Sequence, residues 1–226
     1  MVHFSNRRLR RAEARRLDIL KAAATAFRAR GFAAAGMRDI ASAADLSPGN
    51  LYHYFKGKDE ILFFCQDRAL DRLLAALTAA RRGRAPLAAR LRDLARAHVL
   101  CLVDQVDGSA AHLEVDALPP RLRAQIVAKR DRYERGVRRL IAGGIRDGAL
   151  RPTDPTISTR AFLGALNWTP YWFRSDGPHS APHVADIVAD CAVAGLTSVA
   201  SRKPPVANPR RDYDGYDSAH RQRRAG

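Results

Sequence analysis

The stretch MRDIASAADLSPGNLYHYF, residues 37 to 55, decides the fold of the N-terminal part of this chain. Ile40, Ala41 and Ala44 have helical spacing, and the two alanines are small enough for a second helix to pass closely. Leu51 and Phe55 then recur at the i, i+4 spacing of a buried stripe. Two short helices joined by a tight turn place one helix in the major groove of DNA. The stretch therefore predicts a helix-turn-helix unit.

The residues between these two helices have turn and cap chemistry. Asp45 lies at the turn, where left-handed backbone is usually needed and Asp tolerates it better than most residues. Ser47 is a good N-cap and Pro48 suits the first helical position. An ordinary αα-hairpin inside a core is the alternative interpretation. The outward-facing residues favour DNA binding instead; they are Pro48, Gly49, Asn50, Tyr52, His53 and Tyr54.

The charge of the chain supports a polyanionic partner. Its 226 residues include 39 Lys and Arg against 23 Asp and Glu, a net charge of +16, and its isoelectric point is near 10.9. The positive charge is uneven, because six arginines precede the helix-turn-helix stretch: Arg7, Arg8, Arg10, Arg11, Arg15 and Arg16. Positive charge clustered beside such a unit is typical of DNA-binding proteins.

The cysteines and the hydropathy indicate the compartment. Cys65, Cys101 and Cys191 are odd in number, far apart and in apolar helical contexts, which predicts buried free thiols in a reducing cytoplasm. No apolar run approaches the roughly 18 residues of a membrane span. We therefore expect a cytoplasmic protein that does not enter the membrane.

Hydrophobic periodicity predicts an all-α protein of about nine helices, without strands. The first helix is expected from about residue 13 to 29, ended by Gly31. Short links punctuated by glycine and proline separate the later helices. Four regions are expected: a basic flexible arm at 1–11, the DNA-binding domain at 12–58, a longer helical domain at 59–200 and a disordered basic tail at 201–226.

A dense aromatic cluster near the end of the chain has two interpretations. The cluster, which consists of Trp168, Tyr171, Trp172 and Phe173, could pack in the core or in a dimer interface. It could equally line a ligand pocket, with Asn167 and Arg174 as polar partners. The spacing leaves both interpretations open.

Motifs for catalysis or metal binding are not found in the sequence. There is no Cys-x-x-Cys, no His-Glu-x-x-His and no Gly-x-Ser-x-Gly. His98 lies in a predicted helix, where a hydrogen-bonded histidine or a pocket wall is a better interpretation than a metal ligand. We expect no cofactor, no metal and no enzymatic activity.

The N-terminal block resembles the DNA-binding domain of TetR-family transcriptional regulators. Two positions depart from the family pattern: Gly36 stands where a capping Thr is usual, and Asp45 replaces a turn Gly. Both are tolerable there, so we expect slightly lower stability and the same fold. The matching residues run in order and without gaps: Gly31-Phe32, Arg38-Asp39-Ile40-Ala41, Ala44, Leu46-Ser47, Gly49, Leu51-Tyr52, Tyr54-Phe55, Lys58 and Leu62.

The resemblance implies a role for each matching residue. Arg38 and Asn50 would read base edges, because only side chains with directional donors discriminate bases. Lys58, at the next helix N-terminus, would bind a phosphate. The remaining DNA contacts would come from Ser47, Pro48, Gly49, Tyr52, His53 and Tyr54.

The C-terminal part is similar to one branch of the family, the regulators of fatty-acid and sterol degradation, many of which acyl-CoA esters release from DNA. The similarity lies mainly in LNWTPYWFR, residues 166–174. It implies a homodimeric repressor that binds a palindromic double-stranded operator, with residues 59–200 serving effector binding and dimerisation. For CoA phosphates Arg174 is one available cation, and Arg123, Lys129 or Arg146 are others. The expected effector residues are His98, Asn167, Trp168, Tyr171, Trp172 and Arg174.

An alternative function is that of a basic architectural protein, which coats DNA without sequence preference. The arginine-rich start and the basic tail favour this alternative. The long helical domain argues against it, because coating DNA does not need a domain of that kind.

Overall fold

The computed structural model describes residues 2–103 and 115–197. This part of the chain contains eight α-helices, one short 3₁₀ helix and no strand, so the prediction of an all-α protein is confirmed. The elements are α1 Val2–Ala34, α2 Met37–Ala43, α3 Pro48–Tyr54, α4 Lys58–Arg82, α5 Leu87–Val103, η1 Val115–Ala117, α6 Pro120–Arg146, α7 Pro155–Trp172 and α8 Ala181–Ala194.

Helix α1 is longer than its hydrophobic periodicity predicts. It begins at Val2, so it includes most of the segment expected to be a flexible arm. The physical reason is local, since no glycine or proline precedes Gly31 and the segment is rich in arginine, alanine and leucine, which favour helices. Gly31 interrupts the helix as predicted, with φ 74°, a conformation that glycine adopts at low cost.

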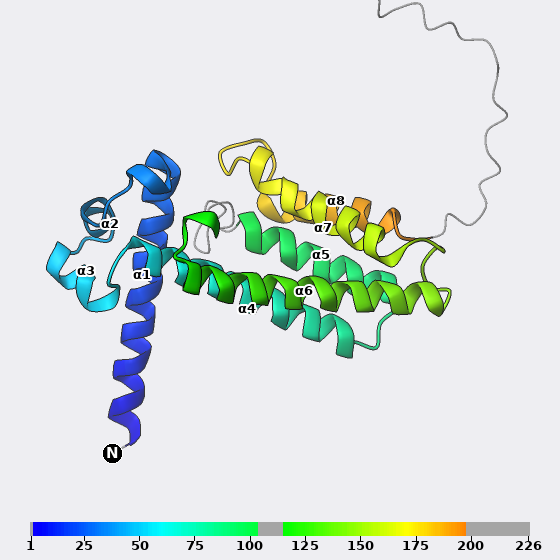
Figure 1. Cartoon of the computed structure of the whole chain (residues 1–226), viewed down its shortest axis with the longest axis horizontal. Helices are drawn as coiled ribbons and strands as arrows, with labels where there is room; N and C mark the ends of the chain where they lie inside the picture. Colours follow the sequence, from blue (N-terminus) through cyan, green and yellow to red (C-terminus); the bar gives the residue numbers. More distant parts are fainter. Residues whose placement is uncertain (1, 104–114, 198–226) are drawn as a thin grey trace, which may run out of the picture.

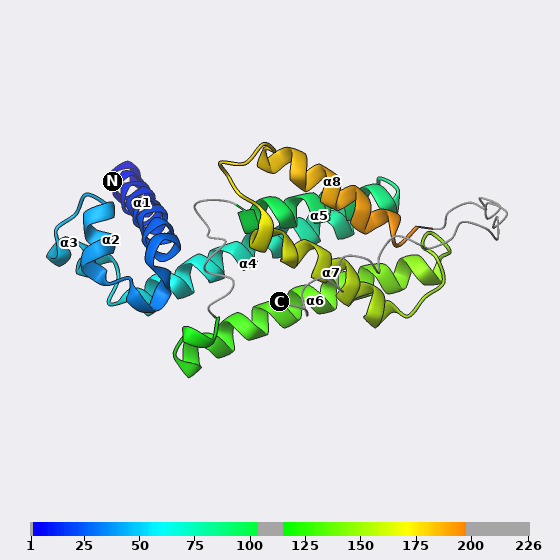
Figure 2. The same cartoon turned by 90° about the horizontal axis from the view of Figure 1, so that it is seen from above.

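The helices form two regions that share α4. Helices α1, α2 and α3 lie at one end of the molecule, where α1 stands steeply against the long axes of α4 and α6 (Figure 1). Helices α4 to α8 form an elongated bundle beside them, with α8 lying over α5 and α7 beside α6 (Figure 2). The expected boundary near Lys58 coincides with the first residue of α4.

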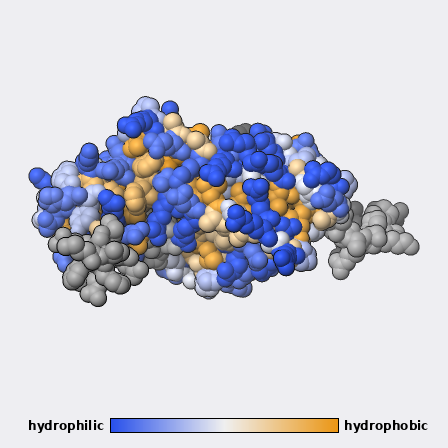
Figure 3. Space-filling model, turned by 90° about the horizontal axis from the view of Figure 1, so that it is seen from below, coloured by the Kyte–Doolittle hydropathy of each residue, from blue (hydrophilic) through white to orange (hydrophobic). Residues whose placement is uncertain are grey.

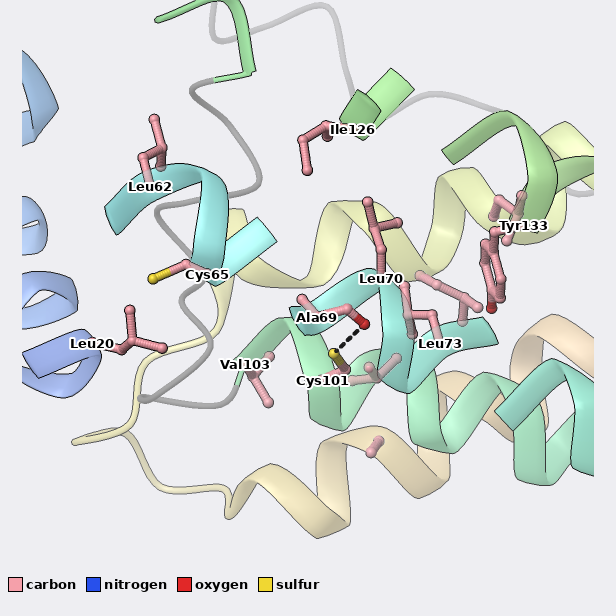
Figure 4. Close-up of a cluster of buried hydrophobic side chains, with 14 of the residues drawn as sticks. Leu20, Leu62, Cys65, Ala69, Leu70, Leu73, Cys101, Val103, Ile126 and Tyr133 are labelled. Carbon is pink, nitrogen blue, oxygen red and sulfur yellow. Dashed lines mark hydrogen bonds between the residues drawn. The ribbon is translucent and has the colours of Figure 1, made fainter. Parts of the chain in front are cut away.

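One continuous apolar core joins the two regions. At its start α4 packs Leu62 and Cys65 near Leu20 of α1, and further along it carries Leu70 and Leu73 toward Tyr133 of α6 (Figure 4). The thiol of Cys101 on α5 donates to the carbonyl of Ala69 at 3.6 Å. Helix α4 therefore contributes to the core of both regions. Cys65 and Cys101 are buried, as predicted, whereas Cys191 on α8 is exposed, which corrects the prediction for that residue.

The surface seen from below is mixed, with apolar patches between hydrophilic side chains (Figure 3). Among the helices described, none is long and apolar enough to cross a bilayer. The basic tail expected at 201–226 lies outside the described residues.

Candidate DNA interface and effector pocket

The turn of the helix-turn-helix unit has the geometry expected for Asp45. Its φ is 53°, so it occupies the left-handed region that Asp tolerates. The guanidinium of Arg15 on α1 donates to the carbonyls of Ala44 and Asp45, at 3.3 and 3.4 Å. These bonds partner carbonyls that the end of α2 leaves without a helical donor. Helix α1 thereby holds the turn that orients α3.

Helix α3 begins as the sequence predicts. The Ser47 hydroxyl accepts a hydrogen bond from the Asn50 backbone N–H at 3.2 Å, and Pro48 occupies the first helical position. Leu51 and Phe55 are buried, and the Phe55 ring meets that of Phe64 edge-on at 5.8 Å. The first turn of α3 is therefore fixed by its cap and its core contacts.

The opposite side of α3 is open to solvent. Pro48, Gly49, Asn50, Tyr52 and His53 are exposed, as is Ser47 before them. Tyr54 differs from the prediction, because it is half-buried and packs against the core. Arg38, near the start of α2, is exposed beside a hollow that Ser42, Ser47 and Pro48 also line. The structure thus brings Arg38 to the same surface as the start of α3.

The N-terminus of α2 compensates for the missing threonine. Gly36 is the N-cap, and the Asp39 carboxylate accepts from its backbone N–H at 2.9 Å. Arg30 of α1 pairs with the other carboxylate oxygen at 2.8 Å. An acidic group in the first turn also interacts favourably with the helix dipole. Asp39 therefore supplies the reciprocal half of a capping box, although the N-cap hydroxyl is absent.

Lys58, for which the resemblance implies a phosphate contact, makes several contacts within the protein. Its ammonium group donates to the carbonyls of Phe32, Ala33 and Ala35 at 2.9, 2.9 and 3.3 Å. It also lies 4.7 Å from the centroid of the Phe32 ring. An ammonium has three N–H donors, and these contacts use all of them. Lys58 thus holds the last turn of α1 and the residue after it in this conformation, and the phosphate contact that the resemblance implies stays a prediction.

A cavity of about 500 Å³ opens between α4, α5, α6 and α7. This volume is within the range of small-molecule sites. Most of the wall is apolar, with Leu70 and Leu73 from α4, Leu102 from α5 and Leu163 from α7. The other lining residues include His98, Arg130, Tyr133, Glu134, Asn167, Trp168 and Tyr171.

A chain of hydrogen bonds crosses the buried wall of this cavity. His98 is 3% exposed, with Nδ1 at 3.0 Å from the Tyr133 hydroxyl and Nε2 at 3.1 Å from Oδ1 of Asn167. Burial lowers the pKa of His98 to about 4, against the opposing effect of the bond to Asn167. Burial also raises the pKa of the Tyr133 hydroxyl. Both groups are therefore neutral at physiological pH and act as hydrogen-bonding groups.

The cationic residue of the cavity wall is Arg130, not Arg174. Arg130 is half-buried on α6, where desolvation lowers the pKa of its guanidinium and the charge of Asp116 opposes this. Arg174 is exposed, makes a bidentate ion pair with Asp176 at 3.1 and 2.9 Å, and does not line the cavity. Helix α7 ends at Trp172, so Arg174 lies beyond the helix that lines the cavity, and its effector contact stays a prediction.

The aromatic cluster divides between the cavity and the surface. Trp168 and Tyr171 line the cavity with rings stacked at 4.5 Å, yet Trp168 is 61% exposed. Trp172 is exposed and does not line the cavity, and its place among the effector residues stays a prediction. Ile157 on the same helix and Ile187 on α8 are also large and exposed. Trp168 and Tyr171 therefore lie at the cavity, as the pocket interpretation expects, whereas packing in the core does not fit these exposed side chains and a dimer interface stays a prediction.

Several lining residues were missed by sequence reasoning. Arg130, Tyr133 and Glu134 lie at i, i+3 and i+4 on α6, so a shared helix face was available as a signal. The leucines of α4 and α5 gave no such signal, because a leucine facing a cavity has the same periodicity as one facing a core.

Comparison with known proteins agrees with this architecture. Residues 19–63 match the family model for bacterial regulatory proteins of the tetR family, and residues 84–196 match the tetracyclin repressor-like C-terminal domain. The transcriptional regulator RutR of Escherichia coli K12 is 34% identical over 164 residues, which cover 68% of this chain and 73% of RutR.

Two solved structures share the fold. The ketosteroid transcriptional regulator KstR2 of Mycobacterium tuberculosis superposes with a TM-score of 0.72 at 27% identity, covering 81% of this chain and 95% of that one. AibR in complex with isovaleryl coenzyme A and operator DNA superposes with a TM-score of 0.66 at 28% identity, covering 80% and 97%. By these matches the chain belongs to the TetR family of bacterial transcriptional regulators.

Proposed function

We propose that this protein is a homodimeric repressor that binds a palindromic DNA operator in the cytoplasm and is released by an acyl-CoA ester. The DNA contacts would come from the exposed side of α3 and from Arg38. Asn50 supplies an amide that can bond an adenine edge, and Arg38 supplies a guanidinium that can bond guanine. Two such helices, related by a two-fold axis and about 34 Å apart, would fit successive major grooves.

The dimer would form through α7 and α8. Ile157, Trp168 and Trp172 on α7 and Ile187 on α8 are large apolar side chains exposed to solvent. Ala161, Gly164 and Ala165 lie between the first two of these on the exposed side of α7 and let a partner helix approach closely. Exposed apolar surface of this kind is typical of an interface. Pairing two helices with their copies gives a four-helix bundle with two-fold symmetry.

The effector proposal rests on the composition of the cavity wall, which carries leucines, a neutral hydrogen-bonding chain and a half-buried cation. The apolar wall suits an acyl chain, and Arg130 can pair with a phosphate of the CoA part. AibR, whose structure contains isovaleryl coenzyme A and operator DNA, provides a related example of this ligand class. The ligand would favour an arrangement of the two DNA-binding heads that no longer matches the spacing of the operator half-sites, so it would lower operator affinity. The operator must then lower ligand affinity by the same factor.

The test is operator binding in the presence of acyl-CoA esters. A duplex selected from random sequence by the full chain is labelled, and its binding is followed by fluorescence anisotropy. Esters of short and medium chain length should release the duplex, and the corresponding free acids should be much poorer. If no sequence is enriched, the protein coats DNA without preference. If no ester releases the duplex, the effector belongs to another chemical class.

Two variants test which of the two arginines, Arg130 or Arg174, contributes to effector binding. Arg130→Met should blunt release by every ester, because it removes the phosphate partner and keeps the aliphatic packing. Arg174→Ala is the matched control, since Arg174 is exposed and paired with Asp176. Both variants should still bind the duplex. Equal behaviour of the two variants would remove Arg130 from the proposed site.

A further inference from the structure

The hydrogen-bonded chain in the cavity wall has a fixed direction. Oδ1 of Asn167 is a carbonyl oxygen and cannot donate, so His98 Nε2 must carry the proton of the bond at 3.1 Å. A neutral imidazole has one donor and one acceptor, which makes Nδ1 the acceptor. The Tyr133 hydroxyl therefore donates to Nδ1 across 3.0 Å. Each bond requires the orientation of the next.

The direction of these hydrogen bonds determines which polar side-chain group of the wall is still available to bond a ligand. The Asn167 amide nitrogen has two N–H donors, and no partner for it is found among residues 2–103 and 115–197. All three residues line the cavity, but Asn167 is exposed, whereas His98 and Tyr133 are buried. The buried pair thus holds an amide donor at the cavity surface, among apolar walls.

We infer that the cavity binds an uncharged oxygen on the acyl part of its ligand, a carbonyl or hydroxyl that accepts from the Asn167 amide. This inference rests on the proposed function and names the effector class more closely, as keto- or hydroxyacyl esters. A saturated chain would leave the amide without an acceptor once it displaces water, which costs binding free energy. His98 and Tyr133 are positioning residues, because they act through Asn167.

The charges of the cavity are consistent with an uncharged oxygen at this position. Tyr133 and the neutral His98 bring no charge to Asn167. Arg130 and Glu134 are the charged residues of the lining, both on α6 and both half-buried. The CoA phosphates would pair with Arg130, which leaves an amide donor for the acyl oxygen.

The test compares matched esters on the same protein. Saturated acyl-CoA esters of short and medium chain length are each paired with their β-keto and ω-hydroxy derivatives, and affinities for the full chain are measured by calorimetry. We expect the best oxygenated member to bind about tenfold more tightly than its saturated partner, the size of one net hydrogen bond. The ratio is insensitive to partial unfolding, because both ligands meet the same protein.

Variants of the protein test whether the preference for oxygenated esters comes from the hydrogen bonds between Asn167, His98 and Tyr133. Asn167→Leu should bring the ratio to about one and leave saturated esters bound. Tyr133→Phe should lower the ratio, and Arg130→Met should weaken all esters alike without changing it; Arg174→Ala is the unaffected control. Saturated esters that bind as tightly as oxygenated ones, or a preference that survives Asn167→Leu, would overturn the inference alone. Failure of every ester to bind would overturn the proposed function and the inference together.

Discussion

The helix-turn-helix unit is built from residues that are close in the sequence, whereas the cavity is built from residues that are far apart in it. In the unit, the exposed residues follow one another within 37–55, and a single cap and turn orient them. In the cavity, the wall comes from four helices, between Leu70 and Tyr171, and no two neighbouring helices suffice to form it. The comparison shows that a site built within one local motif inherits its geometry from short-range rules. A site built between helices depends on packing.

The largest expected effect concerns Lys58, the first residue of α4 after the helix-turn-helix unit. Lys58→Met should cost about 2 to 3 kcal/mol of unfolding free energy, because it removes three charged hydrogen bonds to carbonyls at the end of α1 and directly after it. The salt dependence of operator binding should stay unchanged. Urea denaturation and anisotropy at several salt concentrations measure the two quantities.

Lys56→Met provides the control, since Lys56 is exposed in the same turn. Its effect on the free energy of unfolding should be within about 0.5 kcal/mol. A salt slope shallower by about one unit in Lys58→Met, with unchanged stability, would restore the phosphate role.

Sequence reasoning succeeded where the chemistry is local. Asp45 and Ser47 were correctly assigned because a left-handed turn and an N-cap need only neighbouring residues. Lys58 has the position of a phosphate ligand along the chain, but its partners lie 23 to 26 residues earlier. Arg174 was chosen as an effector residue because it follows the aromatic cluster, and Arg130 was not among the candidate cations. The half-burial of Arg130 at the cavity depends on how α6 packs against α4, α5 and α7, which spacing along the chain does not encode.

The second prediction concerns the pH dependence of folding stability that buried His98 in the cavity wall should cause. Because burial lowers the pKa of His98 to about 4, the unfolded chain, with an ordinary value of 6.5, binds a proton that the folded chain does not. Stability is therefore fully present above pH 6.5 and falls as the pH drops toward 4. Between pH 7 and pH 5 the loss should be about 2 kcal/mol. His98→Gln should show a smaller loss over this window, by urea denaturation; equal losses would mean that His98 is protonated when folded.

The third prediction concerns base reading by the unit. Asn50→Ala should weaken operator binding about tenfold and relax the preference at one base position in each half-site. The fold should be unaffected, because Asn50 is exposed and its cap bond uses the backbone N–H. Anisotropy on single-base variants of the selected duplex measures the preference, with random DNA as the control. An unchanged preference at every position would remove Asn50 from the residues that read bases.

The smallest expected effect tests how the two regions communicate. Lys129 neighbours Arg130 on α6, and its ammonium pairs with Asp67 and Asp71 of α4 at 2.5 and 2.6 Å. Since α4 starts at the helix-turn-helix unit, this contact connects the cavity wall to the DNA-binding region. Half-exposed ion pairs contribute little to stability, so Lys129→Met should fold and bind operator normally.

Lys129→Met should instead weaken the coupling between the two ligands, the operator DNA and the acyl-CoA ester. The factor by which a saturating acyl-CoA ester weakens operator binding should fall about threefold to fivefold, a change typical of residues that connect two sites. Arg135→Met is the matched control, because Arg135 also lies on α6 but pairs with Asp131 of the same helix at 3.7 Å. Titration of operator at several ester concentrations gives the factor for each variant. If Lys129→Met and Arg135→Met keep the same factor, the bridge from α6 to α4 only holds the bundle together, and the ligand must act on the DNA-binding heads through another contact.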